Sequence, residues 1–352
     1  MSKIVAGSND TVDAKVVRHA VEVLLRGGLV AFPTETVYGL GADADQPQAV
    51  AAIFQAKGRP KAHPLIVHVA GADAVGSWAR DIPAAAHALM RRFWPGPLTL
   101  VLPRGARATD LITGGQDTVG VRCPSNAWAQ ALIRGLGSAR GDKTSAIAAP
   151  SANRYGRISP TRAAHVRADL GEKPSGLVDC IIDGGESALG IESTIVDFGE
   201  GAVRILRPGS IDRSQLAVAV GETVRLASDA TTAPRVPGRV SGHYAPSKPL
   251  ELVRPEKLAA RVQALEPLGL GVLAPSEVLQ ALRAANLALC IAAGATPQDY
   301  AHALYDQLRR LDASAAARLL VAYPPTGEAW EAVHDRLRRA AAGSEGRMPE
   351  AD

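Results

Sequence analysis

The chain has 352 residues, 47% of them hydrophobic and only 4% aromatic, with a formal charge of +4 at pH 7. This length accommodates two domains, and the mild positive charge suits an anionic ligand such as a nucleotide while falling short of a dedicated nucleic-acid-binding domain. Three cysteines without metal spacing favour free thiols in a reducing compartment. With no apolar signal core and no run of membrane-spanning length, we expect a cytoplasmic protein with no membrane partner.

Residues 1–215 mix strand and helix patterns in the way typical of one mixed α/β domain. Pro47 near the start of one helix and Gly58 just past its end fit the usual asymmetry of helix termini, and Ser159 with Pro160 suits the start of another. Helices are expected over 13–26, 47–57, 72–80, 83–92, 126–134 and 160–170, and strands over 29–32, 65–69, 98–102, 118–121, 146–149, 177–183, 193–197 and 203–206.

Residues 216–249 interrupt this pattern. The segment 233–246 contains three prolines and two glycines, so it cannot form a regular element, and we expect a linker whose length invites domain motion. After it, four strand patterns alternate with four helix patterns, which predicts a small, doubly wound parallel sheet over 250–341 and a disordered tail over 342–352. The strands are expected over 250–253, 270–274, 287–291 and 318–323, and the helices over 256–265, 276–285, 297–311 and 327–341.

The segment Pro33–Gly41 is the most informative part of the chain. It follows a buried strand and places two hydroxyls, a carboxylate, a phenol and two glycines within nine positions. Glycine permits backbone conformations closed to other residues, and polar loops at strand ends are where open α/β sheets hold ligands. A tight turn with hydroxyl caps explains the same segment equally well.

Several familiar binding and catalytic motifs are absent from the sequence or lack the neighbouring elements that they require. Gly39–Ala44 formally matches G-x-G-x-x-A, but no helix opens on its glycines and no acidic partner follows about twenty residues later. The chain has no G-x-x-x-x-G-K-[ST] loop, no G-x-S-x-G elbow and no zinc-ligand spacing of histidines. These absences disfavour a dinucleotide site, a P-loop enzyme, a hydrolase triad and a structural zinc module.

Other polar residues gather where predicted strands and helices end. Residues 57–61 hold three cations at a helix C-terminus, although solvation and the helix dipole would also explain them. His68 lies among aliphatic residues and would fit a core histidine. Arg122 ends a strand, where a fixed guanidinium is a natural partner for a carboxylate or phosphate. Ser151 and Asn153 follow another strand.

Nine motifs in order make the chain resemble a known family, the two-domain threonylcarbamoyl-AMP synthases. They cover residues 10–246 densely. The resemblance implies a YrdC-like mixed, twisted sheet with helices, linked to a smaller Rossmann-like doubly wound domain. The motifs are PTETVYGLG, KGRP with PLIVHV, FWPGPLTLVL, TVGVRCP, APSAN, SPT, GIESTIVD, ILRPGSI and HYAP.

The resemblance implies a nucleotidyltransferase that joins L-threonine, bicarbonate and ATP into threonylcarbamoyl-AMP and releases pyrophosphate. A separate tRNA threonylcarbamoyl-transfer complex would then receive the product. The chemistry needs no covalent nucleophile, so positioning and charge stabilisation should dominate, with Lys57 and Arg59 as the catalytic residues. A magnesium ion bound mainly through the ATP phosphates would share that work.

The motif match also implies the residues that hold each substrate. Most members carry Asn where this chain has His63, so that contact departs from the family pattern. Arg122 would pair with the threonine carboxylate, and Tyr244 would belong to a linker that closes over ATP. The expected ATP contacts are Lys57, Arg59, His63, Thr118, Ser151, Asn153, Ser159, Arg207 and Tyr244, and the expected threonine contacts are Thr36, His68, Arg122, Ala149 and Ser193.

Two other functions stay open at this point. One is a YrdC-type module that binds tRNA or double-stranded RNA, which the cations of residues 57–61 support but the low aromatic content does not. The other is carbamoyl transfer onto a protein, as in larger relatives of the YrdC type. Those relatives carry acylphosphatase-like and zinc-finger domains, for which this sequence shows no counterpart.

Overall fold

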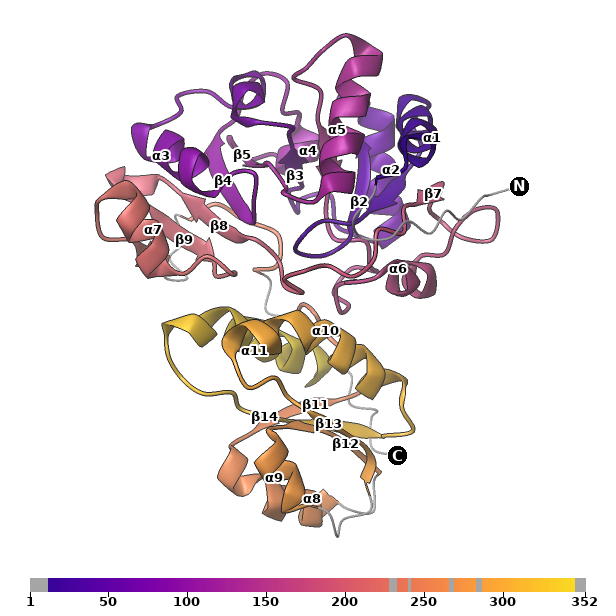
Figure 1. Cartoon of the computed structure of the whole chain (residues 1–352), viewed down its shortest axis with the longest axis vertical. Helices are drawn as coiled ribbons and strands as arrows, with labels where there is room; N and C mark the ends of the chain where they lie inside the picture. Colours follow the sequence, from indigo (N-terminus) through magenta and orange to yellow (C-terminus); the bar gives the residue numbers. More distant parts are fainter. Residues whose placement is uncertain (1–11, 228–232, 240–241, 266–268, 283–286, 346–352) are drawn as a thin grey trace. The chain divides into compact units, whose positions relative to one another are not determined.

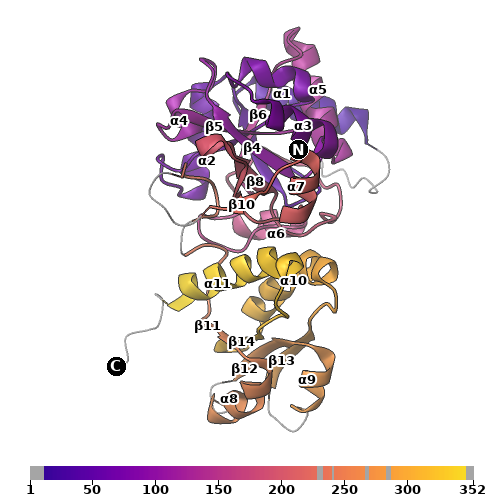
Figure 2. The same ribbon diagram turned by 90° about the vertical axis from the view of Figure 1, so that its left-hand side faces the viewer.

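The computed structural model describes residues 12–227, 233–239, 242–265, 269–282 and 287–345, which form two compact units (Figures 1 and 2). Unit 1 comprises residues 1–155 and 160–239, and unit 2 comprises residues 156–159 and 240–352. The chain therefore leaves unit 1 briefly after Tyr155 and re-enters it at Pro160.

Unit 1 is built on one ten-stranded mixed sheet, which confirms the predicted fold class. The strand order is β10-β9-β8-β4-β5-β3-β6-β2-β1-β7. Neither β2 nor β10 was predicted, because β2 is rich in glycine and β10 has only two residues. The strands are β1 (Val30–Phe32), β2 (Gly39–Asp43), β3 (Ile66–His68), β4 (Leu98–Pro103), β5 (Thr118–Arg122), β6 (Ile147–Ala149), β7 (Cys180–Ile181), β8 (Thr194–Asp197), β9 (Arg204–Arg207) and β10 (Arg225–Leu226).

The predicted helices of unit 1 are present, but α4, η2 and α7 were not predicted, α5 extends to Arg140, and two predicted helices differ at their starts or in type. Residues 72–77 form a 3-10 helix, and the helix expected from 160 begins at Ala163 with Arg162 as its N-cap. Ser159 is therefore not a helix cap, and Pro160 is held instead by the Tyr38 amide, which donates to its carbonyl at 2.8 Å. The helices are α1 (Ala14–Leu25), α2 (Pro47–Lys57), η1 (Ala72–Ser77), α3 (Ala84–Phe93), α4 (Asp110–Thr113), α5 (Ala127–Arg140), α6 (Ala163–Asp169), η2 (Gly199–Gly201) and α7 (Arg213–Val220).

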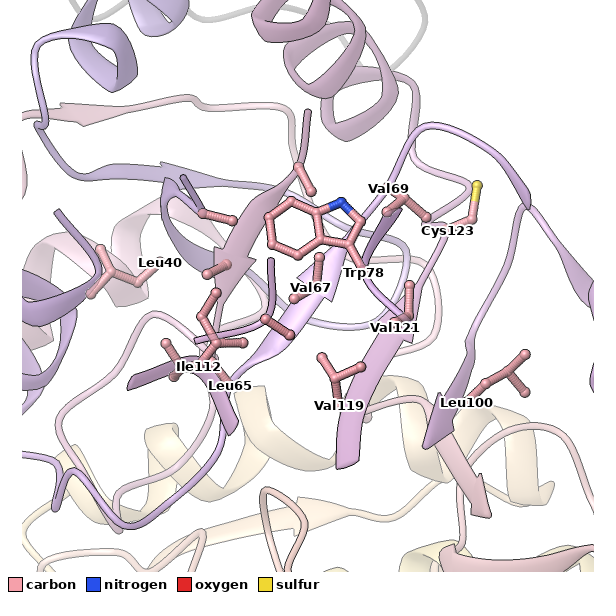
Figure 3. Close-up of a cluster of buried hydrophobic side chains, with 14 of the residues drawn as sticks. Leu40, Leu65, Val67, Val69, Trp78, Leu100, Ile112, Val119, Val121 and Cys123 are labelled. Carbon is pink, nitrogen blue, oxygen red and sulfur yellow. The ribbon is translucent and has the colours of Figure 1, made fainter. Parts of the chain in front are cut away.

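The largest apolar core lies against one face of the sheet. Figure 3 shows Trp78 among Val67 of β3, Val119 and Val121 of β5, and Leu100 of β4. Because side chains alternate between the faces of a strand, the residues between these valines and leucines point to the opposite face. The residues on that opposite face include His68, Thr99, Thr118 and Arg122.

The predicted linker does not coincide with the boundary between the units. Unit 1 continues past residue 215 to Arg239, because α7 packs against α3 and β10 pairs in parallel with β9. Of the segment predicted as a 216–249 linker, residues up to 239 thus belong to unit 1. Residues 228–232 and 240–241 lie outside the described part of the chain.

Unit 2 has a four-stranded, fully parallel sheet of order β11-β14-β12-β13. Figure 1 shows α10 and α11 on one face of this sheet and α8 and α9 on the other, so the predicted doubly wound arrangement is confirmed. The elements are β11 (Leu250–Val253), η3 (Pro255–Lys257), α8 (Leu258–Leu265), β12 (Leu270–Ala274), α9 (Ser276–Gln280), β13 (Leu287–Ala292), α10 (Pro297–Ala313), β14 (Arg318–Ala322), η5 (Glu328–Trp330) and α11 (Glu331–Glu345).

The last helix is longer than predicted. Residues 342–345, expected to begin a disordered tail, complete α11, because Ser344 is buried and its hydroxyl accepts a hydrogen bond of 2.9 Å from the Leu250 amide. This contact ties the end of α11 to the first strand of unit 2. Residues 346–352 lie outside the described part of the chain.

Candidate active site

Lys57 is a buried cation at the C-terminal end of α2. Its ammonium donates to the carbonyl oxygen of Ser151 at 2.6 Å, to the Asn153 carbonyl at a shorter distance, and lies 3.4 Å from the Asn153 side-chain oxygen. Burial, and then the charge of Arg59, lowers the pKa of Lys57 well below its ordinary value. The geometry brings together three of the predicted ATP contacts.

Arg59 lies two residues further on, in the turn after α2. Its guanidinium donates to the carbonyl oxygens of His63 at 3.3 Å and Pro64 at 2.8 Å, and it lies 5.8 Å from the centre of the Tyr155 ring. The His63 Nδ1 atom is 3.3 Å from the Tyr155 hydroxyl. Burial and the nearby Arg59 lower the pKa of His63. Lys57, Arg59 and His63 thus form one group, which we call the cation cluster.

Arg122 is a buried cation of the sheet, at the end of β5. Its guanidinium donates to the Glu35 carboxylate at 2.7 Å, and the other oxygen of that carboxylate accepts from the Ser125 amide at 3.1 Å. The Arg122 Nε atom is buried without a hydrogen-bond partner among the described residues. A buried, unpaired donor on a cation is what a carboxylate ligand would satisfy.

His68 is the direct neighbour of Arg122 in the parallel pairing of β3 with β5. It is buried, its Nδ1 atom lies 3.1 Å from the Ile66 carbonyl oxygen, and its ring meets Phe32 edge-on. Burial, and secondly the charge of Arg122, lowers the pKa of His68 to about 3. The histidine is therefore neutral at physiological pH and does not compete with Arg122 for an anion.

Thr36 belongs to a tight turn after β1. The Thr34 hydroxyl accepts from the amides of Thr36 and Val37 at 3.2 and 3.3 Å, and the two threonine hydroxyls are 2.8 Å apart. The hydroxyl-capped turn is thus the correct geometry for residues 34–37. Glu35, the partner of Arg122, lies within this turn.

The role expected for the glycines of this segment was wrong. Gly39 and Gly41 lie in β2 without the positive φ angles that favour glycine. A Cβ atom on Gly41 would come within 2.7 Å of both Phe32 and Ile147, and one on Gly39 within 3.2 Å of Phe32. Close packing of β2 on its neighbours, and not backbone freedom, requires glycine at these positions.

Ser193 and Arg207 continue the row of polar residues across the sheet. Thr99 of β4 is the cross-strand partner of Arg122, and its hydroxyl lies 2.8 Å from that of Ser193. Arg207 at the end of β9 donates to the Ser193 carbonyl at 2.8 Å and to its hydroxyl at 3.1 Å. His68, Arg122, Ser193 and Arg207 therefore lie in a continuous line through β3, β5, β4, β8 and β9.

Residues 233–239 lie across the same face of the sheet. Val236 packs with Ile66, Val101, Ile195 and Leu206. On one side the Arg235 amide donates to the Gln116 side chain at 2.7 Å, and on the other Arg207 donates to the Pro237 carbonyl at 2.9 Å. This part of the predicted linker is thus a strap that shields the sheet face beside Arg122 and Arg207.

Of the remaining predicted contacts, Thr118 and Ala149 lie in strands of the sheet, and Ser159 and Tyr244 lie in the other unit. Thr118 begins β5 and Arg122 ends it, which separates them by roughly 13 Å at the usual rise of a strand. Ala149 ends β6 and pairs with Ile66. Ser159 and Tyr244 belong to unit 2, so the structure of unit 1 alone does not bring them to the cation cluster.

Within unit 2, the segments that carry Ser159 and Tyr244 contact α10 and α11. Arg309 of α10 donates to the carbonyl oxygens of Ile158 at 2.5 Å and Ser159 at 3.3 Å. Tyr244 has a left-handed backbone with a φ of 62°, and its ring stacks on Tyr305 of α10 at 5.6 Å. A non-glycine residue in this conformation is uncommon and indicates a constrained position.

Two residues of the site were missed by the sequence analysis. Glu35 contacts Arg122, and Tyr155 contacts Arg59 and His63. Glu35 stands in the first motif, but its partner is 87 residues away, and no local pattern links them. Tyr155 follows the APSAN motif, where the spacing alone gives no reason to single out an aromatic residue.

Among the described residues, no group of three or more His, Cys, Asp or Glu side chains is arranged to hold a metal ion. No helix in that part of the chain is long and apolar enough to cross a bilayer.

Comparisons with known proteins identify the family. Residues 22–209 match the family model described as Telomere recombination, and residues 211–342 match the model described as Threonylcarbamoyl-AMP synthase, C-terminal domain. The threonylcarbamoyl-AMP synthase of Bacillus subtilis is 38% identical over 319 residues, covering 88% of this chain and 89% of the relative. The chain belongs to the threonylcarbamoyl-AMP synthase family.

Other relatives agree with this assignment. The threonylcarbamoyl-AMP synthase of Pyrococcus abyssi is 40% identical over 249 residues, or 69% of each chain. A crystal structure of the P. abyssi Sua5 protein complexed with L-threonine has a TM-score of 0.84 and 36% identity, covering 97% of this chain and 98% of that one. The resemblance inferred from the motifs is confirmed, and the chain is an enzyme of the nucleotidyltransferase type.

Proposed function

We propose that the chain joins L-threonine, bicarbonate and ATP into threonylcarbamoyl-AMP and releases pyrophosphate. The observation that carries this proposal is the presence of two separately held sets of buried cations in unit 1, the cation cluster and Arg122. A triphosphate and an amino acid are the pair of anionic ligands that such an arrangement suits. The L-threonine complex of the similar P. abyssi protein supports the amino-acid half.

L-Threonine would bind at Arg122. Its carboxylate can take the buried Nε donor of Arg122, the Ser193 hydroxyl lies along the same row of the sheet, and Thr36 follows Glu35, the partner of Arg122. His68 would contribute a neutral imidazole, and Ala149 only backbone atoms. The neutral histidine and the ion-paired arginine together fit a small zwitterion better than a multiply charged anion.

ATP would bind at the cation cluster. The triphosphate would take the charges of Lys57 and Arg59 and a hydrogen bond from His63, with Ser151 and Asn153 beside Lys57. Arg207 would extend the positive surface along the strap. The contacts proposed for Thr118, Ser159 and Tyr244 stay predictions, because they depend on how the nucleotide and unit 2 are placed.

The chemistry follows from these charges. The threonine amine condenses with bicarbonate, losing water, and gives a carbamate. A carbamate oxygen then forms a bond to the α-phosphorus of ATP while the bond from that phosphorus to the bridging oxygen of pyrophosphate breaks. Negative charge accumulates on the phosphoryl oxygens in this step, and fixed cations in a site shielded from water stabilise it without having to reorient.

A magnesium ion is proposed as the cofactor. Lys57, Arg59 and His63 are cationic or hydrogen-bond-donating groups rather than magnesium ligands, so the triphosphate oxygens would hold the ion, a mode that magnesium favours in nucleotide sites. The ion would neutralise charge on the phosphates. The protein's own residues would orient the triphosphate and meet the remaining charge.

We further propose that the product passes to a tRNA threonylcarbamoyl-transfer complex in the cytoplasm, with at most weak direct binding of tRNA. The rival function, an RNA-binding module, would need an exposed basic surface with stacking aromatics. Instead, Lys57, Arg59 and Arg122 are all buried, with exposed fractions of 3, 6 and 4%. Such cations suit small ligands that enter a site, not an RNA duplex.

The test is to incubate the purified chain with ATP, magnesium, bicarbonate and labelled L-threonine. We expect a labelled adenylate and one pyrophosphate for each adenylate formed, both lost when bicarbonate or threonine is omitted. Salt-dependent binding of RNA without any adenylate would contradict the proposal and favour the RNA-binding module.

Tyr244 provides a separate test of closure by the linker. Because its strained backbone and its stacking on Tyr305 fix its position, Tyr244→Ala should weaken ATP binding or release more adenylate into solution. Unchanged ATP affinity together with unchanged adenylate release would contradict a lid role.

A further inference from the structure

Tyr155 contacts every member of the cation cluster. Its amide donates to the Lys57 carbonyl at 2.9 Å, its ring lies 5.8 Å from the Arg59 guanidinium, and its hydroxyl is 3.3 Å from His63 Nδ1. The Tyr155 and His63 rings also meet edge-on, with centres 5.4 Å apart and planes at 80°. One residue therefore links the end of α2, through its backbone amide, with the following turn, through its side chain.

The segment that carries Tyr155 already surrounds Lys57. The Lys57 ammonium is bound by the backbone of Ser151 and Asn153, and the Lys57 carbonyl by the amide of Tyr155. The Tyr155 ring then extends to Arg59 and His63. Residues 151–155 thus contact the cation cluster through backbone atoms and through the side chains of Asn153 and Tyr155.

The contact with His63 has a consequence for proton placement. A tyrosine hydroxyl can donate to a neutral imidazole, and donation to Nδ1 leaves the proton of the ring on Nε2. The nearby positive charge of Arg59 disfavours a doubly protonated ring. In this arrangement His63 offers an N–H group from Nε2, which is the form that an anionic nucleotide needs.

The contact with Arg59 acts on orientation. A guanidinium over the face of an aromatic ring is attracted to it electrostatically. With the carbonyls of His63 and Pro64 holding other N–H groups of Arg59, the ring leaves the guanidinium few alternative orientations. A preoriented cation loses less entropy on binding a phosphate.

From these contacts we infer that Tyr155 is a positioning residue for the nucleotide, which fixes the tautomer of His63 and the orientation of Arg59. The inference rests on the proposed function in assigning the nucleotide to the cation cluster. Tyr155 acts through His63 and Arg59, and it need not touch the nucleotide itself.

The test uses Tyr155→Phe, which removes the hydroxyl and keeps the ring, alone and combined with His63→Ala. The dissociation constants of ATP and L-threonine are measured by calorimetry, so that the result does not depend on turnover. Loss of a hydrogen bond worth about 1 kcal/mol predicts roughly fivefold weaker ATP binding for Tyr155→Phe. Threonine binding should stay within about twofold of the unaltered protein, on the same scale.

The double variant separates a positioning role from a general structural one. If the hydroxyl acts through His63, Tyr155→Phe should weaken ATP binding further by less than about twofold once His63 is already alanine. Tyr155→Leu, which also removes the ring from Arg59, should weaken ATP binding more than Tyr155→Phe does. Tyr300→Phe is the matched control, because it removes a buried tyrosine hydroxyl in unit 2 that has no hydrogen-bond partner among the described residues.

The inference is overturned if Tyr155→Phe binds ATP as tightly as the unaltered protein, or if it has the same effect with and without His63. Failure of the proposed function is a different result. In that case the unaltered protein would bind ATP without forming an adenylate, and the calorimetric comparison of the variants would still judge Tyr155.

Discussion

Lys57 and Arg122 are both buried cations in unit 1, but different partners hold them. Lys57 contacts the neutral oxygens of Ser151 and Asn153, whereas Arg122 pairs with the carboxylate of Glu35. The hydrogen bonds of Lys57 thus go to uncharged oxygens, and an anionic ligand would supply the opposite charge. At Arg122 the positive charge is already balanced before a ligand binds.

This difference indicates which ligand each region suits. A triphosphate brings several negative charges, which two neighbouring cations such as Lys57 and Arg59 can share. Threonine is a zwitterion with one carboxylate. For this ligand, Arg122 fixed by Glu35 supplies hydrogen-bond donors in a defined orientation and little net positive charge. The lowered pKa of Lys57 fits the same view, because burial next to Arg59 disfavours its charge until an anion arrives.

The largest effect is expected at Arg59. Arg59→Ala should reduce pyrophosphate release by at least about a hundredfold, because it removes a fixed cation from the charge that develops on the phosphoryl group. The measurement is threonine- and bicarbonate-dependent pyrophosphate release at saturating substrates, with circular dichroism to check the fold. Arg91→Ala, at an exposed arginine of α3, is the control and should behave like the unaltered protein. If Arg59→Ala releases pyrophosphate at the rate of the unaltered protein, Arg59 does not stabilise the reacting phosphoryl group.

The next effect is expected at Arg122. Arg122→Ala should raise the KM for threonine by about a hundredfold and lower the melting temperature, because it removes the carboxylate contact and leaves Glu35 buried without its partner. Adding Glu35→Gln should recover much of the melting temperature but not the threonine KM. If stability and threonine KM recover together, Arg122 serves the fold and not the ligand.

Glu35→Gln alone should raise the KM for threonine by less than Arg122→Ala does. An amide still bonds to Arg122 but no longer carries the charge that fixes its guanidinium, so we expect a rise of about tenfold in the KM for threonine. The KM for ATP should change by less than about twofold on this account. Steady-state kinetics with each substrate varied in turn will show whether the change is confined to threonine, and an equal change for both would contradict the division of roles.

The smallest effect concerns the pH dependence of stability at His68. The pKa of His68 is about 3 in the folded chain and near 6.5 in an unfolded one. Between these values the unfolded chain binds a proton that the folded chain does not, so the free energy of unfolding falls as the pH falls, by at most about 1.4 kcal/mol per pH unit for this group. His68→Gln should therefore lose less stability between pH 6 and pH 4 in urea unfolding.

His87→Gln is the control for this pH series, because His87 is an exposed histidine on α3. Its free energy of unfolding should follow the pH profile of the unaltered protein. Parallel profiles for His68→Gln and the unaltered protein would show that His68 is not the source of the acid sensitivity.

Local patterns in the sequence predicted most elements of both sheets, including β3 and β5, whose ends carry His68 and Arg122. They failed at β2, where glycines are required by close packing against Phe32, a contact that only the folded chain reveals. They also missed Glu35 and Tyr155. Each acts on a partner brought close by the sheet or by a distant turn, so no periodicity or spacing along the chain points to it.

The central claim is that the cation cluster holds ATP and that Arg122 holds threonine. The most direct measurement is calorimetric binding of each ligand, separately and without bicarbonate, to Arg59→Ala and to the combined Arg122→Ala and Glu35→Gln protein. We predict that the first variant binds ATP more weakly and threonine as before, and that the second binds threonine more weakly and ATP as before. Loss of the same ligand by both variants would contradict the claim.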